Sequence, residues 1–219
     1  FMPEKVKTEK VKTSAGRHLS KVVGDAYMDL HTKAAQGAFV VWIAINVPAE
    51  LFLGFENVVY GVPESHAALN AAKGVGVLQC EKAEQMGYSM DLCSYARIDI
   101  GSESDGGKDS PTFGLPKPDL LVSDNNNCSL LVKWFDVHHR RMGVPHFVID
   151  VPFCYEPQKE KDRKYIILQF KDLILKIEEM SGQKFDMDKA MAAVSNTSDG
   201  IAHWKRFLSF AQCRPSGIT

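Results

Sequence analysis

The sequence lacks the features that mark several common protein classes. Its most apolar run, AFVVWIAINV at 38–47, is far shorter than the roughly 20 residues of a transmembrane helix. No apolar stretch follows the lysines near the N-terminus, so we expect no secretory signal. GxGxxG, Walker, HExxH and GxSxG motifs are missing. Dinucleotide-binding, nucleotide triphosphatase, zinc protease and hydrolase functions therefore have no support.

A strong charge of one sign is also missing. The chain has 26 basic and 27 acidic residues and a formal net charge of −1. This balance gives no electrostatic reason to expect nucleic acid or a membrane surface as a partner. With 219 residues, 45% of them hydrophobic and 24% charged, the composition is that of a globular protein with a sizeable core.

Cysteines are few and no two of them form a CxxC pair. An odd number at wide, irregular spacing argues against a disulfide framework, and a reducing cytoplasm is the expected location. Spacing alone does not indicate a metal, because a generic pair of cysteines is more often buried and inert. The five are Cys80, Cys93, Cys128, Cys154 and Cys213.

Three apolar, β-branched runs predict parallel strands that are buried on both faces, at 38–46, 118–123 and 145–151. They alternate with helical patterns, which predicts an α/β fold. We expect a Rossmann-like three-layer domain with a mostly parallel sheet, plus C-terminal helices. Between the last two strands a helix should begin at Asn127 as its N-cap and end at Gly143, which makes a right-handed βαβ unit.

Other boundaries follow from local signals. We expect residues 1–21 to form a tail or a surface helix, and residues 22–219 to form one Rossmann-like domain. Pro48 and Gly61 fit the start and stop of a helix. Further expectations are a loop at 101–117, an amphipathic helix at 159–181, and a last helix capped by Asp186 and broken near 197–200.

Two of the cysteines stand at the starts of predicted helices. Cys93 lies in GYSMDLCSYARIDIG, and Cys128 lies in PKPDLLVSDNNNCSLLVKWFD. The N-terminus of a helix favours the thiolate form of cysteine, and a soft metal centre needs thiolates. Cysteines placed in this way can point into one cleft.

The segments around Cys93 and Cys128, together with the runs YGVPESHAALNAA and GVPHFVIDVPF, resemble segments of one enzyme family. The sequence is similar, over roughly residues 35–215, to the N-terminal half of a subunit of the 2-hydroxyacyl-CoA dehydratase and benzoyl-CoA reductase family. The resemblance implies an oxygen-sensitive heterodimer with a related second subunit. It also implies a [4Fe–4S] cluster that three cysteines of the protein hold.

The resemblance implies one of two reactions on an acyl-CoA substrate. The enzyme removes water from a 2-hydroxyacyl-CoA through a ketyl radical, or it reduces an aromatic acyl-CoA such as benzoyl-CoA. A separate ATP-dependent iron–sulfur activator supplies the electron. Ala44 and Ile45 stand where several dehydratases of the family have Thr or Ser, which slightly favours the reductase branch.

By motif, Cys93 and Cys128 match the first two cluster ligands of the family. The third family ligand belongs to a C-terminal domain that this chain lacks, so the chain alone should be inactive. Cys80, Cys154 and Cys213 match no motif, and we expect structural or surface roles for them. The alternative is a non-catalytic α/β domain, or a partner subunit, without a competent cluster site.

The remaining candidates each have a simpler reading. Glu50 follows the first strand and could orient substrate or move a proton, or could only favour the helix N-terminus. Arg97 could bind the cluster or the CoA phosphates, or pair with a nearby acid. A catalytic or metal role for His138 and His139 is less expected, because neighbours on a helix point about 100° apart. Trp134 and its neighbour Phe135 should lie in the core or at a subunit interface.

Overall fold

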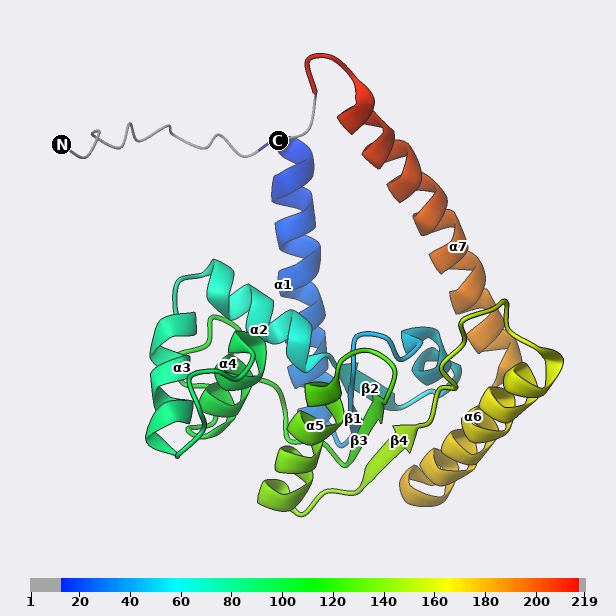
Figure 1. Cartoon of the computed structure of the whole chain (residues 1–219), viewed down its shortest axis with the longest axis horizontal. Helices are drawn as coiled ribbons and strands as arrows, with labels where there is room; N and C mark the ends of the chain where they lie inside the picture. The colour runs from blue at the N-terminus through cyan, green and yellow to red at the C-terminus, as the bar shows by residue number, and fades with distance from the viewer. Residues whose placement is uncertain (1–12, 217–219) are drawn as a thin grey trace.

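The computed structural model of the chain describes residues 13–216. Figure 1 shows a central sheet with helices packed around it, and with α1 and α7 extending away from the body. The helices are α1 (Ser14–Ala35), α2 (Pro63–Ala72), α3 (Gly76–Gln85), α4 (Ser94–Glu103), α5 (Ser129–Met142), α6 (Glu160–Ser181) and α7 (Met187–Ser209). The strands are β1 (Phe39–Ile43), β2 (Val58–Gly61), β3 (Leu120–Asp124) and β4 (His146–Ile149), and two 3₁₀ helices are η1 (Ala49–Gly54) and η2 (Phe210–Gln212).

The sheet is parallel throughout and has the order β2-β1-β3-β4. Trp42 of β1 pairs with Leu121 of β3, and Val122 of β3 pairs with Phe147 of β4. Helix α5 packs on β3 and β4, α6 packs on β4, and α1 packs on β2. The three-layer α/β fold and the three predicted strands are therefore confirmed.

The core lies at the two central strands. Every residue of β3 is buried, and four of the five residues of β1 are buried, because helices cover the sheet. Side chains from α5 and α6 complete this core, which includes Val41, Ile43, Leu121, Phe135, Leu173 and Ile177. Trp134 is also buried, as expected for a core residue.

The helix predicted between Pro48 and Gly61 is wrong. Pro48 precedes a short 3₁₀ helix, η1, and the chain then forms strand β2. The run Val58-Val59-Tyr60 has high strand propensity, and the free edge of β1 gives it backbone partners, with Val58 opposite Phe39. The tertiary pairing therefore overrides the helical start and stop signals.

Helix ends agree with the sequence more closely. Gly143 ends α5 with a left-handed φ of 69°, and the Asp186 carboxylate caps α7 by accepting from the N–H groups of Asp188 and Lys189. The expected N-cap of α5 is displaced by one residue, from Asn127 to Cys128. The expected break near 197–200 is wrong, because α7 is continuous.

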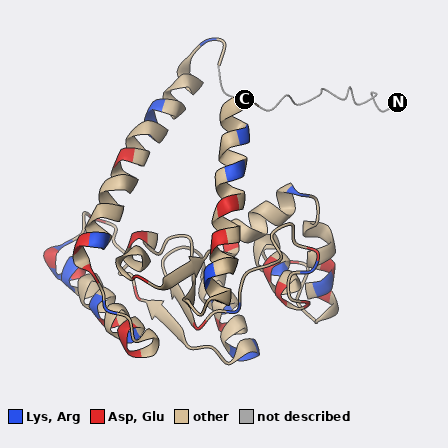
Figure 2. Cartoon of the chain, turned by 180° about the vertical axis from the view of Figure 1, so that it is seen from behind, with Lys and Arg blue, Asp and Glu red and all other residues tan. Residues whose placement is uncertain are grey.

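The N-terminal segment is a helix where it is described. Helix α1 begins at Ser14 and continues through positions 21 and 22 to Ala35, while residues 1–12 lie outside the described residues. Figure 2 shows basic and acidic residues interleaved along the helices. Between residues 13 and 216, no helix is long and apolar enough to cross a bilayer.

Candidate functional site

The topology of the sheet has one switch point at its carboxyl edge. From β1 the chain moves outward to β2, and it then returns to place β3 on the other side of β1. Connections leave the neighbouring ends of β1 and β3 in opposite directions, which opens a space between them. In open α/β sheets this switch point is the usual ligand-binding position.

Two buried carboxylates lie at this edge. Glu64, in the first turn of α2, accepts a hydrogen bond at Oε1 from the N–H of Ile45, just after β1, at 3.1 Å. Asp124, the last residue of β3, accepts at Oδ1 from the N–H of Asn126 at 3.0 Å. The second oxygen of each carboxylate is buried and has no hydrogen-bond partner in the described part of the chain.

The electrostatic environment of Glu64 favours its protonated form. Burial raises the pKa of Glu64 above its ordinary value, and the charges of Asp99 and Asp124 raise it further, against backbone hydrogen bonds that lower it. Its side chain is only 8% exposed. Glu64 is therefore a candidate proton donor at the switch point.

Cys93 and Cys128 each occupy the N-cap position of a helix, as expected. Cys93 precedes α4 and Cys128 precedes α5. Neither side chain caps its helix through a hydrogen bond, and both residues are exposed. Both thiols are therefore accessible to a ligand from outside the chain.

Arg97 and Glu50 lie in separate surroundings. Arg97 forms an ion pair with Glu84 of α3 and donates from Nε to the carbonyl of Leu92 at 3.2 Å. This ion pair agrees with the simpler role considered for Arg97, which is to pair with a nearby acid. Glu50 belongs to η1. The pKa of Tyr60 on β2 is raised mainly by burial and, to a smaller extent, by the charge of Glu50.

The other cysteines do not complete a metal site. Cys80 is half-buried, with Sγ 3.8 Å from the carbonyl oxygen of Ser94, and burial raises its pKa. Cys154 and Cys213 are exposed. Within residues 13–216, no group of three or more His, Cys, Asp or Glu side chains could hold a metal ion. The described residues therefore do not provide a full set of ligands for a cluster.

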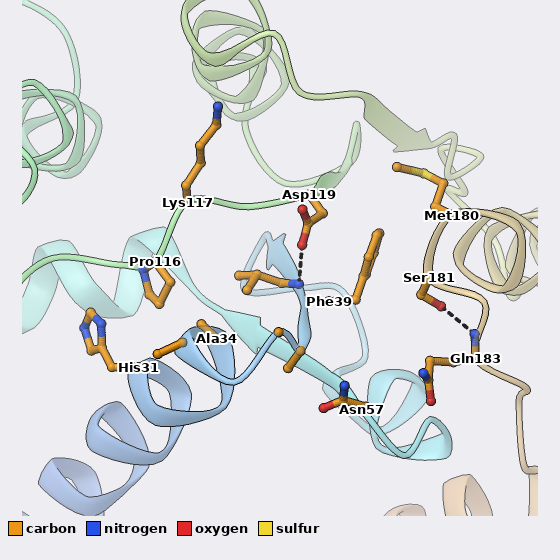
Figure 3. A pocket seen from close by; sticks show the side chains of 14 residues that line it. His31, Ala34, Phe39, Asn57, Pro116, Lys117, Asp119, Met180, Ser181 and Gln183 are labelled. Carbon is orange, nitrogen blue, oxygen red and sulfur yellow. Dashed lines mark hydrogen bonds between the residues drawn. The ribbon is translucent and has the colours of Figure 1, made fainter.

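One cavity lies among helices α2, α3 and α4, and another lies at the amino edge of the sheet. A cavity of about 510 Å³ lies beside the start of α4, where its walls include Cys80, Met90, Ser94 and Arg97. Figure 3 shows another of about 640 Å³, formed around Phe39, Asn57 and Asp119 at the amino ends of the strands. This second cavity is therefore on the edge opposite Glu64 and Asp124.

Sequence reasoning missed three buried acids. Glu64 lies in the run YGVPESHAALNAA, where an acid in the first turn of a helix after a strand was a usable signal. Asp124 ends the predicted strand PDLLVSD, which was a weaker signal. No sequence signal marked Asp99, because its partner His138 comes from a distant helix. The burial of His138, beside an exposed His139, agrees with the expectation that the two face different ways.

The chain is similar to subunits of several enzymes. It is 35% identical to the (R)-phenyllactyl-CoA dehydratase alpha subunit of Clostridium sporogenes, over 96% of this chain and 51% of that protein. It is 34% identical to the (R)-2-hydroxyisocaproyl-CoA dehydratase alpha subunit of Clostridioides difficile, over 90% and 48%. It is 27% identical to one of the subunits of benzoyl-CoA reductase of Thauera aromatica, over 99% and 51%. The chain thus spans about half the length of these relatives.

A family model supports the same assignment over most of the sequence. The model described as 2-hydroxyglutaryl-CoA dehydratase, D-component matches residues 44–219. The matched region contains the buried acids at the sheet edge and both N-cap cysteines. The chain belongs to the 2-hydroxyglutaryl-CoA dehydratase D-component family.

Proposed function

We propose that the chain supplies the N-terminal domain of one subunit of an iron–sulfur 2-hydroxyacyl-CoA dehydratase. The observation that carries this proposal is the match over residues 44–219 in a fold that places Cys93 and Cys128 at two helix starts. Two dehydratase relatives, 35% and 34% identical to the chain, are more similar to it than the reductase relative at 27%, and a third dehydratase subunit, at 26%, is about as similar as the reductase. This difference favours dehydration over ring reduction, in spite of Ala44 and Ile45.

In this proposal Cys93 and Cys128 are two ligands of a [4Fe–4S] cluster, and a further ligand comes from outside the chain. When it is bound, the cluster supplies an electron of low potential and an iron that can take an oxygen ligand. Exposed thiols at helix starts suit this role, since a ligand from outside the chain can reach them. Arg97 remains a candidate for binding the cluster or the CoA phosphates. Its ion pair with Glu84 would fix its position.

The chain's own carboxylates would handle protons. Elimination of water needs a proton for the departing hydroxyl oxygen and a base for the hydrogen on the neighbouring carbon. Glu64 suits the first task because its pKa is raised and its Oε2 has no partner in the described residues. Glu50, in η1 after β1, remains a candidate for orienting substrate or moving a proton.

The proposed partners follow from the same assignment. They are a related second subunit, an ATP-dependent iron–sulfur activator protein and an acyl-CoA substrate. The names of the dehydratase relatives specify alpha subunits, which supports a partner subunit. The rival function is a non-catalytic α/β domain, which is favoured by the lack of a third metal-binding side chain near the cysteines in residues 13–216.

Iron binding separates the two functions. The complete subunit and its partner are prepared anaerobically, and iron, sulfide and visible absorption are measured for the natural protein and for Cys93→Ser, Cys128→Ser and Cys213→Ser. We expect both N-cap variants to lose cluster absorption, and the variant of exposed Cys213 to keep it. A natural protein without iron after reconstitution would favour the non-catalytic domain.

The isolated chain gives a second test. We expect the 219 residues alone to retain no chelator-resistant cluster, because two thiolates make a weak site. A stoichiometric, stable cluster would contradict this and would make Cys80, Cys154 or Cys213 a ligand.

A further inference from the structure

Buried polar side chains connect helices α4 and α5. Oδ2 of Asp99 accepts hydrogen bonds from Nε1 of Trp134 at 2.9 Å and from Nε2 of His138 at 2.6 Å. The exposed fractions of the three side chains are 2%, 4% and 0%. The connection is therefore shielded from water, where hydrogen bonds to a charged group are strongest.

A second connection sets the relative direction of the two helices. Four residues after Asp99, the carboxylate of Glu103 accepts from Nε and Nη2 of Arg141 at 3.0 and 2.8 Å. Arg141 in turn follows His138. Since the two connections occur in the same order along both helices, α4 and α5 run in the same general direction and begin at the same end.

The spacing along each helix is the same. Asp99 comes six residues after Cys93 (99 − 93), and Trp134 comes six residues after Cys128 (134 − 128). At about 1.5 Å of rise per residue, each N-cap cysteine lies about 9 Å along its helix from the Asp99–Trp134 hydrogen bond. The two thiols therefore lie at about the same distance along their helices from one shared contact.

This contact joins two parts of the domain. Helix α4 packs mainly against α2 and α3, whereas α5 packs against β3 and β4. His138 also contacts the sheet, since its ring meets Trp42 edge-on with the centroids 5.1 Å apart. Asp99 therefore links the α2–α4 group to the helix that is fixed on the sheet.

The carboxylate of Asp99 is held in its charged form. Burial would raise the pKa of Asp99, but the neighbouring charge and hydrogen bond of His138, with His66 at 3.9 Å, hold it well below the ordinary value. A buried carboxylate with hydrogen-bond partners of this kind adds little net stability compared with apolar packing. Its directional bonds do restrict rotation and sliding of one helix against the other, which apolar side chains would tolerate.

We propose that Asp99 is a positioning residue that fixes the separation of the Cys93 and Cys128 thiols through its bonds to Trp134 and His138. The cluster that these thiols would hold rests on the proposed function, but the separation is a property of this chain. Without Asp99 the two helix starts should sample a wider range of separations while the domain stays folded.

The test measures the separation directly. The full chain carries Cys80→Ser, Cys154→Ser and Cys213→Ser, and spin labels are attached at Cys93 and Cys128, which are both exposed. Pulsed dipolar EPR then records the distance distribution with Asp99 present and with Asp99→Asn. We expect the distribution to become at least about twofold wider in Asp99→Asn, because a neutral amide accepts weaker hydrogen bonds from Trp134 and His138 than the carboxylate does.

Matched variants separate positioning from general stability. Leu173→Ala removes fully buried core volume on α6, away from α4, and should lower stability without widening the distribution. If Asp99→Asn fails to fold, Trp134→Phe removes one of the two bonds to Asp99 and should widen the distribution by a smaller amount. An unchanged distribution in the folded Asp99 or Trp134 variant would overturn the proposal.

The result is independent of the proposed enzyme. Iron retention by the complete subunit forms a second arm, in which Asp99→Asn should retain less iron than Leu173→Ala. A wider distribution with no iron in any variant would uphold the positioning role and reject the cluster. Equal iron retention in the two variants, together with an unchanged distribution, would reject the positioning role alone.

Discussion

Nε2 of His146 on β4 lies 2.8 Å from Oγ of Ser123 on the neighbouring strand β3. Burial, together with the nearby charge of His139, lowers the pKa of His146 from its ordinary 6.5 to about 4. The folded protein thus holds this ring neutral where the unfolded chain would bind a proton. The contact has a direct consequence for stability against pH.

Because the folded pKa is depressed, the unfolded chain binds more protons between pH 6.5 and 4. The contribution of a neutral His146 is full above pH 6.5 and is lost as the pH falls toward 4. The loss should be at most about 3 kcal/mol. Urea unfolding of His146→Gln at several pH values checks this, since the variant should show a flatter profile in that window. Parallel profiles for the two proteins would contradict the prediction.

Removing His138 should be costly, because the buried Asp99 carboxylate then loses its shortest hydrogen bond. We expect His138→Leu to lower the free energy of unfolding by about 3–5 kcal/mol. The double variant with Asp99→Leu should recover part of this loss. His139→Gln, at the exposed neighbouring position, is the control and should change stability by less than about 1 kcal/mol. A small effect of His138→Leu would show that this hydrogen bond contributes little to stability.

Glu64→Gln tests the proton donor at the sheet edge. The amide oxygen can still accept from the N–H of Ile45, so the fold should persist. We expect kcat of the assembled enzyme to fall by about 10²–10⁴-fold, as for loss of a general acid or base. Glu56→Gln, whose side chain is 86% exposed, is the control. Full activity of a folded Glu64→Gln enzyme would remove Glu64 from the mechanism.

Two glycines should respond to alanine in opposite ways. A Cβ at Gly101 of α4 would lie 1.9 Å from the carbonyl oxygen of Gln79 on α3, so Gly101→Ala should separate these helices and destabilise the domain. Gly24 of α1 has nothing within 4 Å of that position, and Gly24→Ala should stabilise by about 0.5–1 kcal/mol. Thermal unfolding compares them. Similar midpoints for the two variants would contradict the packing between α3 and α4.

Local sequence pattern was enough to predict part of the fold. The apolar β-branched runs around Val41, Leu121 and Val148 predicted three parallel strands, and residues such as Gly143 and Asp186 predicted where helices end or begin. These features follow from side-chain periodicity and backbone conformation within a few residues. The family resemblance was also a property of the sequence, and the match to residues 44–219 confirms it.

Features that need a distant partner could be read only from the folded chain. Residues 58–61 form a strand because β1 offers them an edge, although the local signals suggested a helix. Asp99 can be buried because His138, 39 positions away, forms a hydrogen bond with its carboxylate. Glu64 reaches the end of β1 across 19 positions through the N–H of Ile45. The physical reason is that burying a charge or an edge strand is favourable only with a partner in place, and the position of that partner depends on the whole fold.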